Sequence, residues 1–192
     1  MILAAGLARR MGRDKLNLPL GDRPVIRHTA EMVFSASWFE SIVVINPRNG
    51  DAIRQALEGL SLRFVCNERF EQGIATSIAT GAAAVSPDSE AMLLVQGDQP
   101  LVTSEMLGEL VDTWTRGGYE FVAASFDRIT TTPVLFDSAL LGELAALEGD
   151  IGARAVLKRH QGHTISFPQW RGLDLDTEED YAEVRRIWAT LA

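Results

Sequence analysis

Positively charged side chains and small residues are concentrated near the start of the chain, in the segment LAAGLARRMGRDK at positions 3–15. Its first residues are Leu3, Ala4, Ala5 and Gly6. The small residues Ala4, Ala5 and Gly6 let backbone N–H groups come close to phosphate oxygens. Arg10 and Lys15 carry charges that suit the outer phosphates, the arginine as a two-pronged donor and the lysine as a point charge. The segment therefore predicts a cradle for the triphosphate of a nucleotide.

Two better-known phosphate-binding loops do not match this segment. A P-loop needs a lysine directly after its second glycine, but Arg13 and Asp14 separate Gly12 from Lys15. A dinucleotide fingerprint needs another glycine two residues after the first, and Gly6 is followed there by Ala8. These mismatches disfavour a nicotinamide-dependent oxidoreductase.

Aspartates at two further places suit a metal ion. Asp98 follows the apolar run LLVQ in the sequence GDQP, and Asp174 and Asp176 stand in LDLDTEEDY. A triphosphate carries negative charge on its oxygens, and Mg²⁺ held by one or two carboxylates is the usual neutraliser. Alternation along an extended segment would point Asp174 and Asp176 to the same side. We predict Asp98 as a metal ligand together with at least one of these two, and the residues alone do not decide which.

Short apolar runs alternate with longer amphipathic ones, which is typical of a single α/β domain with a mostly parallel sheet. The predicted strands are 1–4, 41–46, 63–67, 91–96, 119–125, 133–136 and 164–167. The predicted helices are 24–34, 50–60, 73–85, 103–116, 138–147, 152–160 and 177–191. In an open parallel sheet, ligands bind beyond the carboxyl ends of the strands. We therefore expect the loops at Gly6, Asp98 and 174–176 to share one edge of the sheet.

The composition indicates which binding partners and which cellular compartment to expect. The chain has 192 residues, 46% of them hydrophobic, and a net charge of −8, which argues against binding to nucleic acid or to an anionic membrane. It begins directly with the strand-like MILA, so we expect a cytoplasmic protein. Cys66 is the single cysteine, which leaves no partner for an intrachain disulfide, and we expect it to be a small buried residue.

The first segment resembles the signature L-[AG]-[AG]-G-x-[AGS]-x-R-[ML]-G-x-x-K of the sugar-nucleotide type of nucleotidyltransferase, complete at every defined position. GDQP resembles the metal-binding turn of that family, and LDLDTEEDY its D-[IL]-D-T-x-E-D-[YL] element. With GIATSI, PVLF and LEGDIGAR, the resemblance covers nearly the whole chain and narrows to the molybdenum cofactor cytidylyltransferases of the MobA-like transferase group. It implies a three-layer α/β/α, Rossmann-like domain spanning residues 1–192.

The resemblance also implies an activity and its partners. CMP would pass from CTP to molybdopterin with release of pyrophosphate, in the presence of Mg²⁺, and a molybdenum enzyme would receive the product. The guanylyltransferases of the group usually carry a second glycine where this chain has Ala5, so alanine favours CTP over GTP. Three alternatives stay open. They are a MobA-like guanylyltransferase, transfer to another phosphorylated acceptor such as a sugar or polyol phosphate, and a non-catalytic molybdenum cofactor accessory protein.

The resemblance assigns roles residue by residue. Arg10, Lys15 and Asp98 would be catalytic, and Asp98, Asp174 and Asp176 are the metal candidates. The nucleotide would meet Leu3, Ala4, Ala5, Gly6, Arg10, Lys15, Asn67, Gly73, Thr76, Ser77 and Asp98, with Asn67 and Ser77 as candidates for contacting the base.

The acceptor side departs from the family. The stretch FDRITTTP has no glycine between Ser125 and Pro133, where the family usually has one. Asp150, Gly152 and Arg154 of GDIGAR could hold an anionic acceptor at a helix start, or form a plain cap with a surface arginine.

Overall fold

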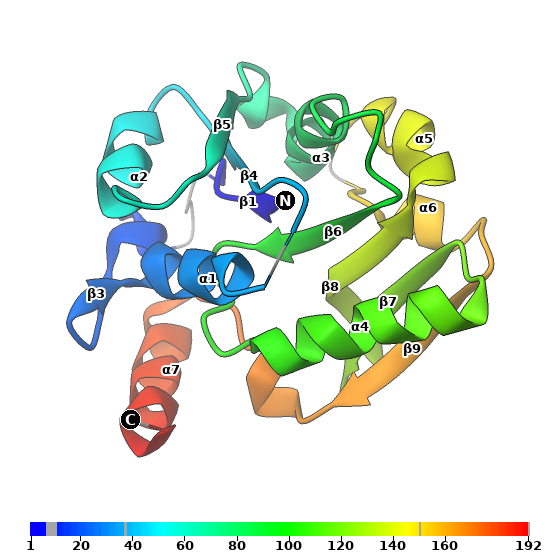
Figure 1. Cartoon of the computed structure of the whole chain (residues 1–192). Coiled ribbons are helices and arrows are strands. Elements are labelled where there is room, and N and C mark those ends of the chain that lie inside the picture. Colours follow the sequence, from blue (N-terminus) through cyan, green and yellow to red (C-terminus); the bar gives the residue numbers. More distant parts are fainter. Residues whose placement is uncertain (7–10, 37, 150, 192) are drawn as a thin grey trace.

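The computed structural model describes residues 1–6, 11–36, 38–149 and 151–191 (Figure 1). Within these residues, seven strands form one sheet in the order β5-β4-β1-β6-β8-β7-β9. The strands are β1 (Ile2–Leu3), β4 (Ile42–Ile45), β5 (Arg63–Cys66), β6 (Ala91–Gln96), β7 (Phe121–Phe126), β8 (Ile129–Asp137) and β9 (Gly162–Phe167). Only β8 of these runs antiparallel to its neighbours, so the prediction of a mostly parallel sheet is confirmed.

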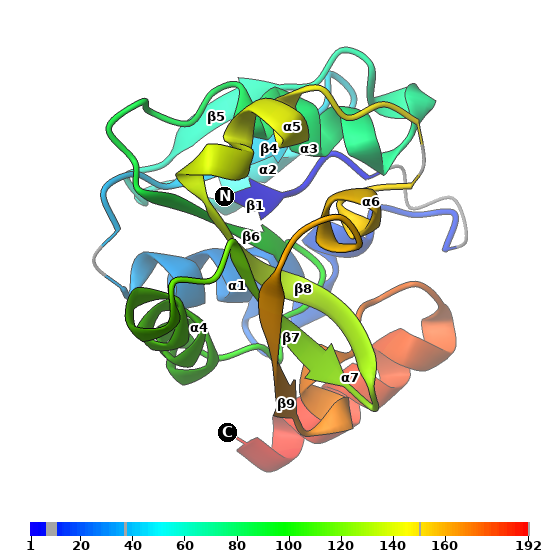
Figure 2. The same cartoon turned by 90° about the vertical axis from the view of Figure 1, so that its right-hand side faces the viewer.

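Helices cover both faces of the sheet, which gives the expected three layers (Figures 1 and 2). One face packs against α1 (Val25–Phe34), α2 (Gly50–Ala56) and α4 (Ser104–Gly117). The other packs against α3 (Ile74–Ala82), α5 (Leu141–Ala145) and α6 (Arg154–Leu157). Strand β4 shows how the sequence leads to this arrangement. All four of its residues are apolar and buried, two toward each layer of helices. A strand covered on both faces reads as a continuous apolar run.

A third apolar cluster joins the last helix to the segment that follows the cradle. Helix α7 (Glu178–Leu191) buries Tyr181, Val184 and Ile187 against Leu18 and Leu20. Leu20 lies in a small antiparallel ribbon of β2 (Pro19–Leu20) and β3 (Arg23–Pro24). This packing brings the start of α7 to the same edge of the sheet as the loop after β1.

The β7–β8 hairpin turns without glycine. Asp127 and Arg128 form its two-residue connection with φ of 48° and 65°. Both are in the left-handed region that a tight hairpin turn requires and that glycine or asparagine usually occupies. The two residues therefore form the turn without glycine, and β8 (Ile129–Asp137) extends well beyond the predicted 133–136.

Other differences from the sequence predictions are local. Helices α5 and α6 are shorter than predicted, with a 3₁₀ turn at Ser138–Leu140 before α5. The expectation for Cys66 is wrong, because it is exposed at the end of β5, the strand at the sheet's margin. Among the described residues, every helix is too short or too polar to cross a membrane.

His160 lies between two glutamates and links the segments that precede β7 and β9 to helix α5. His160 Nδ1 lies 2.8 Å from an Oε1 of Glu120, and its Nε2 lies 2.6 Å from an Oε2 of Glu143. Hydrogen bonds to Glu120 and then Glu143 raise the pKa of His160 above its usual 6.5. The N–H of Gln161 and then His160 lower the pKa of Glu120, and Arg159 and then His160 lower that of Glu143, from the usual 4.5.

These shifts predict a pH-dependent stability. The contribution of His160 is complete below pH 6.5 and is lost as pH rises through its raised pKa, whereas that of the glutamates is lost as pH falls through their lowered pKa values. The loss of Tm caused by His160→Gln should be larger at about pH 5.5 than at about pH 8.5. His163→Gln is the matched control, since the His163 ring stacks on Tyr119. An equal loss at both pH values for His160→Gln would contradict this account.

Candidate active site

The loop after β1 is held by two asparagines from the turn that follows the neighbouring strand β4. Asn46 Nδ2 donates to the carbonyl oxygen of Ala5 at 3.0 Å, and Asn49 Nδ2 donates to that of Ala4 at 2.6 Å. Ala4 and Ala5 are buried, whereas Gly6 is exposed, and among the described residues no atom lies within 4 Å of where its Cβ would be. The backbone therefore leaves the sheet at a fixed place. Sequence reasoning missed both asparagines, although the turn NPRN directly after a buried strand was a usable signal.

Arg10 of the predicted cradle lies outside the described residues, so its role stays a prediction. The described part of the loop is fastened to α7 instead. Arg13 donates from Nε and Nη2 to both carboxylate oxygens of Glu178, at 2.7 and 2.6 Å. Asp14 Oδ1 accepts the N–H of Leu16 at the start of a 3₁₀ turn, Lys15–Asn17. These two contacts fix the backbone on either side of the next residue, Lys15.

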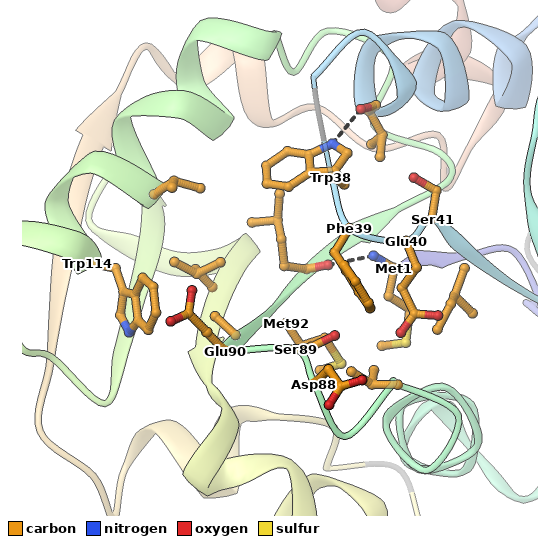
Figure 3. Close-up of a pocket in the computed structure, with 17 residues that line it drawn as sticks. Met1, Trp38, Phe39, Glu40, Ser41, Asp88, Ser89, Glu90, Met92 and Trp114 are labelled. Atoms are coloured by element: carbon orange, nitrogen blue, oxygen red, sulfur yellow. Dashed lines mark hydrogen bonds between the residues drawn. The ribbon is translucent and has the colours of Figure 1, made fainter.

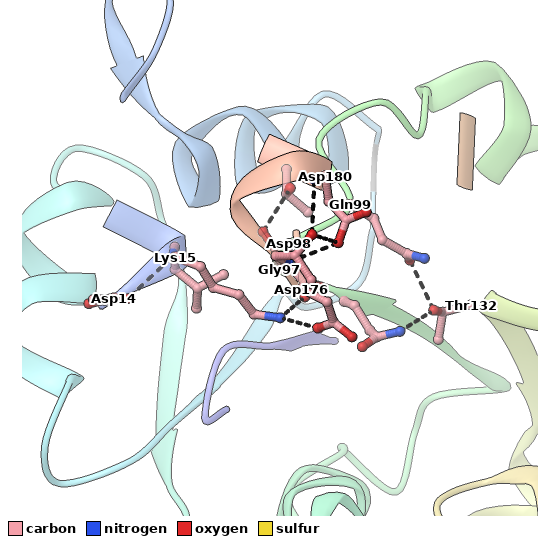
Figure 4. A network of polar contacts seen from close by, with 12 residues as sticks. Asp14, Lys15, Gly97, Asp98, Gln99, Thr132, Asp176 and Asp180 are labelled. Carbon is pink, nitrogen blue, oxygen red and sulfur yellow. Dashed lines mark hydrogen bonds and ion pairs between the residues drawn. The ribbon is translucent and has the colours of Figure 1, made fainter. Parts of the chain in front are cut away.

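Lys15 joins two of the predicted metal aspartates (Figure 4). Its Nζ lies 2.5 Å from Oδ2 of Asp98 and 3.0 Å from Oδ1 of Asp176. Lys15 and Asp98 are largely buried, with side-chain exposures of 14% and 8%, whereas Asp176 is 39% exposed. The loop after β1, the loop after β6 and the segment before α7 therefore meet at one point, as the sequence predicts for the carboxyl edge of a parallel sheet.

Asp98 is positioned by a glycine that no larger residue could replace without displacement. A Cβ on Gly97 would lie 2.7 Å from Cδ1 of Ile26 and 3.0 Å from the carbonyl oxygen of Leu3. The hydroxyl of Thr29 in α1 donates to the Gly97 carbonyl at 3.1 Å. The turn thus packs directly on β1, and the carboxylate that follows is held at the sheet edge.

The second acidic segment is ordered by the cap of α7. Thr177 and Asp180 bond reciprocally, because the Thr177 N–H and hydroxyl donate to Asp180 Oδ2 and the Asp180 N–H donates to Thr177 Oγ1. This resembles a capping box, with Thr177 as the cap of α7. The side chain of Leu175 is fully buried, and the aspartates on either side of it, Asp174 and Asp176, lie near Asp98.

The electrostatics of the site follow from this crowding. Burial alone would lower the pKa of Lys15, but the charges and hydrogen bonds of Asp98 and Asp176 outweigh it, so the pKa of Lys15 is raised. Burial, followed by the charges of Asp98 and Asp176, raises the pKa of Asp174. Carboxylates are thus concentrated enough to disfavour one another's charge, and a cation between them is strongly favoured.

The donor set fits a hard divalent cation. Within the described residues there is no group of three acidic, histidine or cysteine side chains arranged to hold a metal. Mg²⁺ needs fewer, since it typically binds one or two carboxylates and completes its shell with phosphate oxygens and water. Asp98 and Asp176 already share one cation, the Lys15 ammonium, so they provide such a pair.

The residues predicted to meet the base form a second group at the start of α3. Asn67 Nδ2 donates to both Thr76 Oγ1 and Ser77 Oγ at 2.9 Å, and all three side chains are buried. Asn67 Oδ1 accepts the N–H of Arg69 at 2.9 Å. Gly73 has a φ of 113°, which favours glycine, and its carbonyl accepts the Thr76 hydroxyl. The amide of Asn67 therefore fixes the loop, and base contact by these residues stays a prediction.

A cavity of about 230 Å³ lies between α3, α6 and the splayed ends of β6 and β8. Its lining includes Leu3, Gln96, Arg154 and the threonines Thr130, Thr131 and Thr132. Of the predicted acceptor residues, Gly152 and Arg154 border it and Asp150 lies outside the described residues. Helix α6 is a single turn, so the cationic side chain of Arg154 is the stronger candidate for an anion contact than the helix end.

A larger cavity of about 530 Å³ lies at the opposite, amino edge of the sheet (Figure 3). Trp38, Phe39 and Trp114 line it together with Met1, whose amino group donates to the Leu93 carbonyl at 2.7 Å. Burial lowers the pKa of that amine to about 5. None of the predicted site residues borders this cavity, so size alone does not identify the site.

The chain is similar to a known protein family, to curated proteins and to solved structures over most of its length. The family model described as the MobA-like NTP transferase domain matches residues 1–164. The chain is 29% identical to the purine catabolism protein PucB of Bacillus subtilis over 97% of this chain and 95% of that protein. It is also 29% identical to the molybdenum cofactor guanylyltransferase of Cereibacter sphaeroides, with the same coverage. A Mycobacterium tuberculosis protein, Rv0371c, in complex with manganese aligns with a TM-score of 0.79 and 26% identity over 96% of both chains.

The hydrogen bonds of Asn67 predict a measurable cost for its removal. Asn67→Ala should lower the free energy of unfolding by about 2–3 kcal/mol, because it leaves buried hydroxyls and the Arg69 N–H without a partner. Asn17→Ala is the control, since Asn17 bonds only the exposed Asp14 among its described partners. Urea denaturation measures both variants. A loss no larger for Asn67→Ala than for Asn17→Ala would show that Asn67 does not hold this loop.

Proposed function

The chain belongs to the MobA-like NTP transferase family, and we propose that it transfers CMP from CTP to molybdopterin with release of pyrophosphate. The observation that carries the proposal is the contact of one buried lysine with Asp98 and Asp176 beyond the carboxyl ends of the strands. The arrangement supplies cationic and carboxylate groups where phosphates and a metal must be held together.

In the proposed reaction, an oxygen of the acceptor phosphate attacks the α-phosphorus of CTP in line with the departing group. The new P–O bond forms as the bond from the α-phosphorus to the bridging oxygen of the β-phosphate breaks, and pyrophosphate leaves with the electron pair. No nucleophile from the protein is needed. The protein acts by positioning and by stabilising charge.

Lys15 and Arg10 are the proposed cationic groups for the β- and γ-phosphates. Lys15 is already charged and largely buried at the site, where a charge interacts more strongly than in water. The small residues Ala4, Ala5 and Gly6 would bring backbone N–H groups near the same phosphates. Asp98 and Asp176 would hold a divalent cation, Mg²⁺ in this proposal, which supplies neutralisation of phosphate charge. The manganese complex of the mycobacterial protein supports a divalent ion in this fold.

The acceptor is proposed to occupy the cavity bordered by Arg154 and the three threonines. The two exposed apolar residues Ile74 and Ile151 at its rim suit a flat, partly apolar molecule, and Arg154 suits its phosphate. The name of the Cereibacter relative supports a molybdopterin acceptor, and it makes GTP the alternative donor. Ala5 in place of a second glycine supports CTP.

The test is pyrophosphate release and product analysis with each of the four NTPs and reduced molybdopterin. We expect release with CTP to exceed release with GTP, and Asp98→Ala and Lys15→Ala each to lower kcat/KM by about 10²-fold or more. Arg116→Ala on α4 is the control, because its exposed ion pair with Asp112 lies on another element.

The other outcomes separate the alternatives. A preference for GTP identifies a guanylyltransferase, and release only with sugar or polyol phosphates identifies another acceptor. Tight nucleotide binding without turnover on any acceptor favours an accessory protein. Full activity of both Asp98→Ala and Lys15→Ala would contradict the mechanism.

A further inference from the structure

In the glycine-free stretch before Pro133, Thr132 links the proposed nucleotide side of the site to the proposed acceptor side. Adjacent β7 residues Ala123 and Ala124 pair with Val134 and Thr131, so Thr132 and Pro133 form a bulge in β8. Strand β6 pairs with β8 as far as Leu94 opposite Val134. Beyond that pair β8 stays with β7 alone, and the cavity proposed for the acceptor opens between the two strand ends. Bulges commonly re-aim a side chain beside an active site.

The Thr132 hydroxyl spans this opening (Figure 4). It donates to Oε1 of Gln99 at 2.9 Å and accepts from Nε2 of Gln96 at 2.8 Å. Thr132 is 9% exposed and Gln99 only 1%. In so buried a place, a hydroxyl that donates once and accepts once fixes both partners, and its loss leaves polar atoms unpaired.

Both glutamines lie within the machinery on the nucleotide side. Gln99 directly follows Asp98, whose carboxylate contacts Lys15. Gln96 is the last residue of β6 and pairs with Leu3 of β1, and the next N–H, that of Gly97, donates to the Leu3 carbonyl at 2.9 Å. The Thr132 hydroxyl on β8, the strand beside the proposed acceptor cavity, is therefore bonded to residues on both sides of the Gly97–Asp98 turn.

We propose that Thr132 is a positioning residue, which holds the Gly97–Asp98 turn in register with the acceptor-side strand. It acts through Gln96 and Gln99 and does not itself take part in bond making. This inference rests on the proposed function, because it places an acceptor beside Thr132 and a nucleotide beside Asp98.

The experiment compares Thr132→Val, which keeps the shape and removes the hydroxyl, with Thr132→Ser, which restores it. For Thr132→Val we expect kcat with the preferred NTP and acceptor to fall about 10- to 100-fold with little change in the KM for the NTP. Thr132→Ser should recover most of the loss. Thr115→Val is the matched control, since the Thr115 hydroxyl bonds the Val111 carbonyl within α4. Gln99→Met should reproduce Thr132→Val, and the double variant should lose no more than either single one.

A second readout does not depend on turnover. Hydrogen exchange of the backbone amides at 97–99 should be faster in Thr132→Val and Gln99→Met than in the wild type, and close to the wild-type rate in Thr132→Ser. If the wild type turns over no acceptor, the proposed function fails while exchange still decides the inference. Unchanged exchange at 97–99, or wild-type kcat in a folded Thr132→Val or Gln99→Met, would overturn it.

Discussion

The contact of Lys15 with Asp98 and Asp176 is the interaction on which the rest of the site depends. It joins three segments far apart in the sequence, and each is fixed by its own element. The 3₁₀ turn after Asp14 carries the lysine, the Gly97 turn packed on β1 carries one carboxylate, and the Thr177 cap of α7 places the other. Two carboxylates placed this close repel one another, so both stay charged only with a cation between them. The same requirement makes the place suited to phosphates and a divalent ion, whose charges complement those of the lysine and the aspartates.

The sequence predicted this convergence because the carboxyl ends of parallel strands share one edge. The strands at 41–46 and 91–96 were recognisable as short apolar runs, and their ends gave the loops of the site. The ribbon of β2 and β3 could not be found, since two-residue strands have no periodicity to detect. The length of β8 was missed for a different reason. Its threonines follow a turn formed by Asp127 and Arg128, two residues that rarely adopt the left-handed conformation found there.

The supporting polar network was less predictable than the charged residues it holds. Lys15, Asp98 and Asp176 belong to chemical types that stand out in a motif, whereas Asn46, Asn49, Gln96 and Gln99 act by hydrogen bonds whose partners are distant in sequence. Cys66 shows a similar limit, because composition favours burial but only the strand order places β5 at the margin. Residue type therefore indicated the chemistry, while strand order decided which side chains support it.

The most direct test of the account is the binding of Mn²⁺ in the presence of CTP, followed by electron paramagnetic resonance. The wild-type chain should bind Mn²⁺ together with CTP, and Asp98→Asn should weaken this binding about 10- to 100-fold. Asp112→Asn, on the exposed surface of α4, should bind as the wild type does. Equal affinity of Asp98→Asn and the wild type would contradict the claim that the carboxylates contacted by Lys15 are where metal and nucleotide meet.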